Sequence, residues 1–144
     1  MKYLRKFIIL PFRVKAALVE AYLCLGFARF LIWRFQFKRF AWIFGQVNCE
    51  TEFSDEGLDP AKMKEVSQAI RTMSRHTFWE SKCLAQACAA KIMLNRRKQR
   101  STVYLGVAKD SRGEMIAHAW VRCGTRYITG GDGSKKFTTT SKFT

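Results

Sequence analysis

The stretch of sequence that decides the fold reads Trp79-Glu-Ser-Lys-Cys-Leu-Ala-Gln-Ala-Cys-Ala-Ala-Lys-Ile-Met-Leu94. Its second half is almost wholly apolar and too long for an ordinary β-strand, so the pattern predicts a buried α-helix. A cysteine, Cys83, stands at the front of this apolar run. The sequence thus predicts a central helix that carries a thiol near its start.

Two residues compete as the N-cap of this helix. Thr77, with Glu80 three residues later, forms a capping box that would place Cys83 a turn deeper in the helix. Ser81 would instead begin the helix at Lys82 and place Cys83 in its first turn. Free N–H groups and the helix dipole stabilise a thiolate there. The sequence favours Ser81.

Three strand-like runs follow the helix. They span Thr102–Ala108, Glu114–Arg122 and Arg126–Thr129. A loop and a short turn join them, as expected for neighbouring antiparallel strands. The final stretch, 134–144, is either an edge strand or a frayed end. An antiparallel meander packed on a central helix belongs to the α+β class.

Cys83, His118 and Asp132 occur in this order on the predicted helix, strand and strand. A thiolate nucleophile, an imidazole base and a carboxylate that orients the base are the parts of a cysteine-dependent acyl-transfer site. The order and spacing therefore predict a catalytic triad.

The third member of the triad has a competitor. Strand alternation puts Glu114 on the same face as His118. A two-residue turn at 124–125 would point Asp132 to the other face, whereas a longer turn or a bulge at 130–131 would restore it. Paired glycines suit a bulge, so the sequence favours Asp132 over Glu114.

The other cysteines show no sign of an activated or metal-bound thiol. Cys24 and Cys88 lie inside apolar helical runs, and Cys49 and Cys123 lie in a loop and a turn. No Cys-x-x-Cys pair occurs and the two histidines stand far apart, so neither a metal nor another cofactor is expected. Five cysteines without a recognisable signal peptide predict reduced thiols in the cytoplasm.

The composition limits the class of partner. The 144 residues include 26 Lys and Arg against 11 Asp and Glu, a formal net charge of +15. Such a charge favours anionic partners, namely nucleic acid, acidic peptide or anionic lipid. Apolar residues make up 48% of the chain, which is enough for one globular domain and too many for a disordered chain.

Residues 1–45 combine basic and aromatic side chains, and apolar residues recur at helical spacing after Pro11. Charges interrupt the pattern too often for a membrane span, which needs an apolar run of about 20 residues. The favoured interpretation is helices that cover the domain core. The alternative is peripheral membrane contact, in which aromatic residues enter the lipid between basic ones. Those residues are Phe30, Trp33, Phe35, Phe37, Phe40 and Trp42, with Arg34, Lys38 and Arg39.

An acidic loop over 46–58 separates this region from the rest. Asp59-Pro60 then opens a helix, with an acidic N-cap and a proline in the first helical position. The expected buried stripe of that helix is Met63, Val66, Ile70 and Met73. The chain is thus divided into a basic, aromatic-rich helical region (1–45), an acidic loop (46–58) and a catalytic core (59–144).

Five motifs together resemble the lasso-peptide leader peptidases. These are the stand-alone, transglutaminase-like cysteine protease half of a split maturation protein, related to the processing protein of microcin J25. The resemblance covers about residues 75–137. The motifs are Cys83-Leu-Ala-Gln-Ala, Met93-Leu-Asn-Arg-Arg97, Leu105-Gly-Val-Ala-Lys109, Ala117-His-Ala-Trp-Val121 and Ile128-Thr-Gly-Gly131.

The resemblance implies a papain-like or transglutaminase-like core and a cytoplasmic cysteine endopeptidase. Cys83 would be the nucleophile, His118 the base and Asp132 the orienting acid, with Gln86 a candidate to line the site. The substrate would be a ribosomally made lasso-peptide precursor that loses its leader. The implied partners are a separate leader-binding protein and an amide-forming cyclase, without nucleic acid.

Two other functions fit the same residues. The triad could transfer the acyl group to an amine instead of water. Alternatively, the chain could be a non-catalytic basic adaptor that binds membrane or nucleic acid through residues 1–45 and 91–100. Only the adaptor hypothesis expects no effect from Cys83→Ala.

Overall fold

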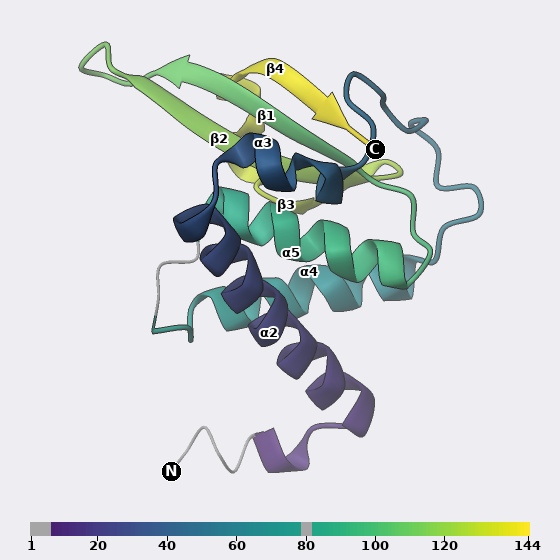
Figure 1. Cartoon of the computed structure of the whole chain (residues 1–144). Helices are drawn as coiled ribbons and strands as arrows, with labels where there is room; N and C mark the ends of the chain where they lie inside the picture. The colour runs from purple at the N-terminus through teal and green to yellow at the C-terminus, as the bar shows by residue number, and fades with distance from the viewer. Residues whose placement is uncertain (1–6, 79–81) are drawn as a thin grey trace.

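Helix α5 (Cys83–Arg96) is the element on which the other elements pack. The computed structural model describes residues 7–78 and 82–144. In it, α5 lies between a four-stranded antiparallel sheet and the helices α2 (Phe12–Arg34) and α4 (Pro60–Ser74) (Figure 1). The predicted α+β class, with a cysteine-bearing helix packed on an antiparallel sheet, is confirmed.

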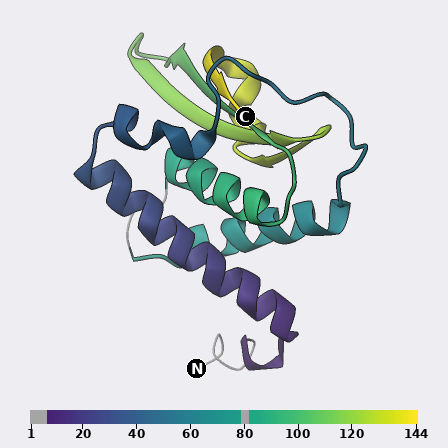
Figure 2. The ribbon, with the colours of Figure 1, turned by 45° about the vertical axis from the view of Figure 1, so that its right-hand side comes forward.

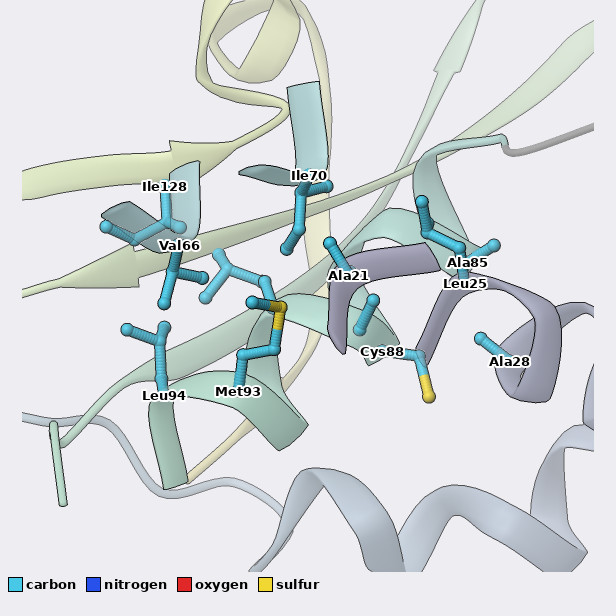
Figure 3. Close-up of a cluster of buried hydrophobic side chains, with 14 of the residues drawn as sticks. Ala21, Leu25, Ala28, Val66, Ile70, Ala85, Cys88, Met93, Leu94 and Ile128 are labelled. Atoms are coloured by element: carbon cyan, nitrogen blue, oxygen red, sulfur yellow. The ribbon is translucent and has the colours of Figure 1, made fainter. Parts of the chain in front are cut away.

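The composition of α5 explains this close packing. Its buried surface consists largely of small residues, which let neighbouring backbones approach on several sides at once. Figure 3 shows side chains from α2, α4, α5 and the sheet meeting in one apolar cluster. The fully buried α5 residues are Ala87, Cys88, Ala89, Ala90, Met93 and Leu94.

The sheet follows the predicted meander. Its strands are β1 (Thr102–Lys109), β2 (Met115–Cys123), β3 (Arg126–Thr129) and β4 (Thr138–Phe143), in the order β3-β2-β1-β4. The first three strands match the prediction to within one residue at each end. Of the two predictions for the final stretch, the edge strand is the one found.

Helix α4 forms as its sequence predicts. The side chain of Asp59 accepts a hydrogen bond from the N–H of Ala61 at 2.9 Å, and Pro60 occupies the first helical position. The predicted stripe faces the core: Met63, Val66 and Ile70 are buried and Met73 packs against them.

Helix α2 packs along α4 and α5 on one side of the molecule (Figures 1 and 2). Its inward face is buried, with Ala21, Leu25 and Ala28 fully enclosed. Among the described helices it alone is long and apolar enough to cross a membrane by length and composition, despite the charges that interrupt it. Two short helices, α3 (Phe37–Phe40) and η1 (Ala41–Phe44), continue the chain toward the sheet.

The segment after η1 pairs with the far end of the chain. The backbones of Gln46 and Thr144 exchange two hydrogen bonds, of 2.7 and 3.1 Å. The N–H of Asn48 donates to the carbonyl of Lys142 at 2.8 Å. These bonds lie on the outer edge of β4, so the acidic loop begins as an extension of the sheet.

A buried arginine fixes the acidic loop over the sheet. Arg122, near the end of β2, is only 1% exposed. Its guanidinium donates to the carbonyls of Thr51 and Glu52 at 2.6 and 3.1 Å. It lies over the ring of Phe53, 3.6 Å from the centroid. The loop therefore supplies the hydrogen-bond acceptors that a buried arginine needs.

We predict that Arg122→Met lowers the free energy of unfolding by about 3 kcal/mol, because it leaves buried carbonyls without a donor. Arg126→Met is the matched control. Arg126 is half exposed on the adjacent strand, and its nearest acidic atom, on Asp55, is 4.0 Å away. Urea unfolding of both variants measures the difference. Equal stability of the two variants would contradict a structural role for Arg122.

Candidate active site

Cys83 is the first residue of α5. The N-cap is Lys82, so the helix begins one residue later than the Ser81 cap predicts. Ser81 itself, with Trp79 and Glu80, lies outside the described residues. Thr77 lies just beyond the end of α4, and its N–H donates to the carbonyl of Met73 at 3.1 Å.

The prediction that Cys83 lies in the first turn is therefore confirmed by its position in α5. The first N–H groups of an α-helix have no intrahelical acceptor and carry partial positive charge. The thiol of Cys83 is partly exposed and packs against the edge of the core. Such a position leaves the thiol accessible beside the free N–H groups of the helix start.

Cys88, Cys123 and Cys24 lie in environments that disfavour the thiolate. Cys88 lies on the α2 side of α5 within the apolar cluster (Figure 3). Burial raises the pKa of Cys88 to about 12 and that of Cys123 to about 11. Burial also raises the pKa of Cys24, and the nearby Glu20 adds to the shift. These thiols stay protonated at neutral pH.

His118 on β2 is held by a turn and by aromatic rings. Its Nε2 lies 2.8 Å from the carbonyl oxygen of Gly130. A carbonyl oxygen only accepts, so Nε2 carries the hydrogen and donates, which leaves Nδ1 as the basic nitrogen. The ring stacks on Trp120, with centroids 5.7 Å apart, and packs against Phe137 at 4.9 Å.

Asp132 lies in the turn that contacts His118, but not on a strand as predicted. It belongs to the 3-10 helix η2 (Gly131–Lys136), and its side chain is exposed. Within the described ranges, no hydrogen bond or ion pair involves its carboxylate. The same turn returns to the imidazole at Gly133, where an added Cβ would lie 3.8 Å from Nε2 of His118.

The predicted bulge exists, but at a different residue. The turn between β2 and β3 has two residues, and the pairing shifts between Val121 and Arg122, which leaves Ile128 as the extra residue. The expected position at 130–131 was wrong. The carbonyl of Ile128 accepts from Ser67 of α4 at 2.8 Å, a contact that no local pattern reveals. Gly130 instead adopts a left-handed conformation, with φ of 68°.

Glu114 is remote from the imidazole. It precedes β2 at the tip of the β1–β2 hairpin, where its N–H donates to the side chain of Asp110. It stands four positions before His118 in extended chain, a separation of about 13 Å. This geometry removes the ground on which Glu114 competed with Asp132.

The described contacts do not bring Cys83 and His118 together. Alternation along β2 directs Ala119 and Val121 toward α5 and places His118 and Trp120 on the other face. No hydrogen bond between Cys83 and His118 occurs in the described part of the chain. The residues that immediately precede Cys83 lie outside it, and the triad stays a prediction.

Sequence reasoning missed a polar network behind His118. Tyr104 of β1 stacks on Trp120, with centroids 5.5 Å apart, and its hydroxyl accepts from Arg122 at 2.8 Å. That hydroxyl donates to Glu50, and Lys142 pairs with the same carboxylate at 2.6 Å. Burial, reinforced by Glu50, raises the pKa of Tyr104 to about 12. An arginine inside a strand otherwise rich in apolar residues was the available signal.

No group of three or more potential metal ligands occurs among the described residues. Cavities among the described residues lie along α2 and α4, and one of them reaches β3. One of them, of about 680 Å³, lies between α2 and α4 and is lined by residues such as Leu10, Leu18 and Ala69.

A thiol at the start of a buried helix, an imidazole on the sheet and an α+β framework are features that cysteine proteases and acyltransferases share. The sequence profile of the Transglutaminase-like superfamily matches residues 27–142. The chain belongs to this superfamily, whose members are typically cysteine proteases or acyltransferases. No curated relative and no solved structure shows significant similarity to it.

Thiol alkylation tests the environments of the cysteines. At pH 8, a pKa of about 12 leaves roughly one thiolate in 10⁴ for Cys88, so we expect iodoacetamide to modify Cys83 well before Cys88 in the folded protein. Peptide mapping by mass spectrometry gives both rates. Denaturation should bring them together, which is the control. Similar rates in the native protein would contradict the assignment of Cys83 as the accessible thiol.

Proposed function

We propose that this chain is a cysteine endopeptidase that removes the leader from a ribosomally made lasso-peptide precursor. The observation that carries the proposal is the position of Cys83 as the first residue of the buried helix α5. The superfamily match supports the cysteine chemistry. The five motifs that resemble leader peptidases support the choice of substrate.

In the proposed mechanism, Cys83, His118 and Asp132 act together. The Cys83 thiolate attacks the carbonyl carbon of the bond between leader and core, and a tetrahedral oxyanion forms. Nδ1 of the His118 imidazolium then gives its proton to the departing amine, which leaves a thioester. Water, deprotonated by the same nitrogen, then attacks the thioester, releases the leader as an acid and restores the thiolate beside the imidazolium.

The described geometry supports these roles for the histidine. The bond from Nε2 to Gly130 fixes the imidazole tautomer that leaves Nδ1 free to accept the proton. We assign Asp132 to Nε2 because the turn that carries it already supplies the Gly130 carbonyl to that nitrogen and passes close to it again at Gly133. Its carboxylate would add a negatively charged acceptor that stabilises the imidazolium.

The start of α5 would bind the oxyanion. The N–H groups of the first helical turn point along the axis toward the thiol end and are free of intrahelical acceptors. Donors aimed at a developing negative charge stabilise the transition state more than the ground state. Gln86, one turn further and partly buried, is a further candidate to line the site.

The proposal includes two partner proteins. The split organisation of the family that the motifs resemble implies a separate leader-binding protein and an amide-forming cyclase. Tethering the leader to a docking protein would raise the local substrate concentration at Cys83. The rate of precursor cleavage with and without the leader-binding protein tests this part. Equal rates would place leader recognition within this chain.

The superfamily match equally favours acyl transfer to an amine as a second candidate. The thioester at Cys83 is common to both reactions, and only the acceptor differs. Cleavage assays that contain a labelled primary amine separate the two. Incorporation of the label into the acyl product, in place of free acid, would identify a transferase.

We predict that Cys83→Ala lowers precursor cleavage by about 10³-fold or more, because no other nucleophile replaces the thiolate. Cys88→Ala is the matched control. It removes a thiol of the same helix that is fully buried, and it should retain most of the activity. Rates are measured with purified precursor, and circular dichroism checks the fold of both variants. A fully active Cys83→Ala would favour a non-catalytic adaptor.

The third triad member is tested by Asp132→Asn, which keeps the shape of the side chain but removes its charge. We predict that kcat falls by about 100-fold or more, since the imidazolium loses its counter-ion. Glu114→Gln, which alters the carboxylate at the hairpin tip, should leave kcat unchanged. If Asp132→Asn remains fully active, the carbonyl of Gly130 alone orients His118.

A further inference from the structure

The outward face of α2 is apolar along almost its whole length. Leu23 is 64% exposed and Phe12 86% exposed, and the other members of the stripe are about half exposed. At about 100° per residue, these side chains fall within an arc of about 80°. We call this set the α2 stripe; it consists of Phe12, Val19, Leu23, Phe27 and Phe30.

The opposite face of α2 is fixed in the protein core. Ala21, Leu25 and Ala28 are 0% exposed and lie on the side of the helix turned away from the stripe. The helix is therefore apolar on two faces, and the fold buries only the one that carries Ala21, Leu25 and Ala28 (Figure 3). A surface helix of a soluble domain normally presents polar residues on its outer face.

The surroundings of the stripe are cationic. Glu20, the only acidic residue among 7–45, pairs with Arg96 and Arg97 of α5 at 3.0 and 2.7 Å. Within the described ranges, no acidic side chain pairs with the remaining basic residues of this region other than Arg13. The residues without an acidic partner are Lys15, Arg29, Arg34, Lys38 and Arg39, of which Lys15 donates to the carbonyl of Ile8 at 2.7 Å.

Aromatic residues mark the end of the stripe where the basic residues gather. Trp33 is 74% exposed and Trp42, in η1, is 76% exposed. Indole side chains favour the boundary between lipid headgroups and acyl chains. In contrast, Phe40 is buried and Phe35 and Phe37 pack against the core, so these three of the predicted lipid contacts are unavailable.

An open groove runs beside the first half of the stripe. Its volume is about 490 Å³, and its lining includes Phe12, Val19 and Leu23 together with Lys15 and the ion pair between Glu20 and Arg96. Apolar walls beside Lys15 suit an acyl chain and an anionic headgroup, whereas Arg96 is already paired with Glu20. The same combination of apolar area and basic charge governs the affinity of interfacial helices for anionic lipids.

We propose that the α2 stripe docks this protein on an anionic membrane surface, with α2 parallel to the membrane plane. Phe27, Phe30 and Trp33 enter the interface while Arg34, Lys38 and Arg39 meet the headgroups. A membrane-spanning orientation would extract Leu25 and its neighbours from the core and separate Glu20 from Arg97. The helix therefore lies on the membrane while its inner face stays in the fold.

Vesicle binding of the full chain tests the proposal independently of any cleavage activity. We expect cosedimentation with phosphatidylglycerol vesicles at low salt and little with phosphatidylcholine vesicles. The triple variant Arg34→Glu, Lys38→Glu, Arg39→Glu should weaken binding by about 100-fold or more. Leu23→Ser with Phe27→Ser should abolish it, whereas Met115→Ser, a 63% exposed residue on the β1–β2 hairpin, should not.

Fluorescence then locates the contact. Brominated phosphatidylglycerol should quench emission, and Trp33→Phe with Trp42→Phe should remove most of that quenching. The proposal is overturned if the wild type fails to bind phosphatidylglycerol, or if the Leu23 and Phe27 double variant binds as well as the wild type. Self-association through the stripe, seen by sedimentation without vesicle binding, would instead identify a second copy as its occupant.

Discussion

The burial of α5 on nearly every side is the constraint on which the structure depends. A helix can contact two helices and a sheet at once only if small side chains let all three come close, and alanines supply these contacts. Because its sides are enclosed, the start of the helix is the part left to present a functional group. Cys83 occupies that position. The helices α2 and α4 and the sheet, which pack on α5, therefore hold Cys83 in place.

His118 is held by a layer of aromatic side chains on the face of the sheet that points away from α5. Tyr104, Trp120, His118 and Phe137 form a row of packed rings, and Arg122 secures one end of the row to the acidic loop. Rigid ring contacts restrict rotation of the imidazole, while the Gly130 carbonyl sets its tautomer. Orientation of the proposed base thus depends on residues that take no part in bond making.

Much of this arrangement could be predicted from sequence because the signals were local. The Asp59-Pro60 cap, the long apolar run after Cys83 and the alternation in β1 and β2 each reflect short-range stereochemistry. The bulge at Ile128 could not be predicted, because it coincides with a hydrogen bond to Ser67, about 60 residues earlier. The glycines that suggested a bulge are needed for a different reason. At Gly131, for example, an added Cβ would lie 2.5 Å from Tyr127.

The pairing of Gln46 with Thr144 has a consequence for how the molecule is made. These residues are about 100 positions apart, yet their hydrogen bonds join the end of η1 to the outer edge of β4. Contacts of such sequence separation form late, since the entropy of closing a long loop opposes them. During synthesis, α2, α4 and α5 can associate before β4 has left the ribosome. The acidic loop would gain its fixed course only in the last step of folding.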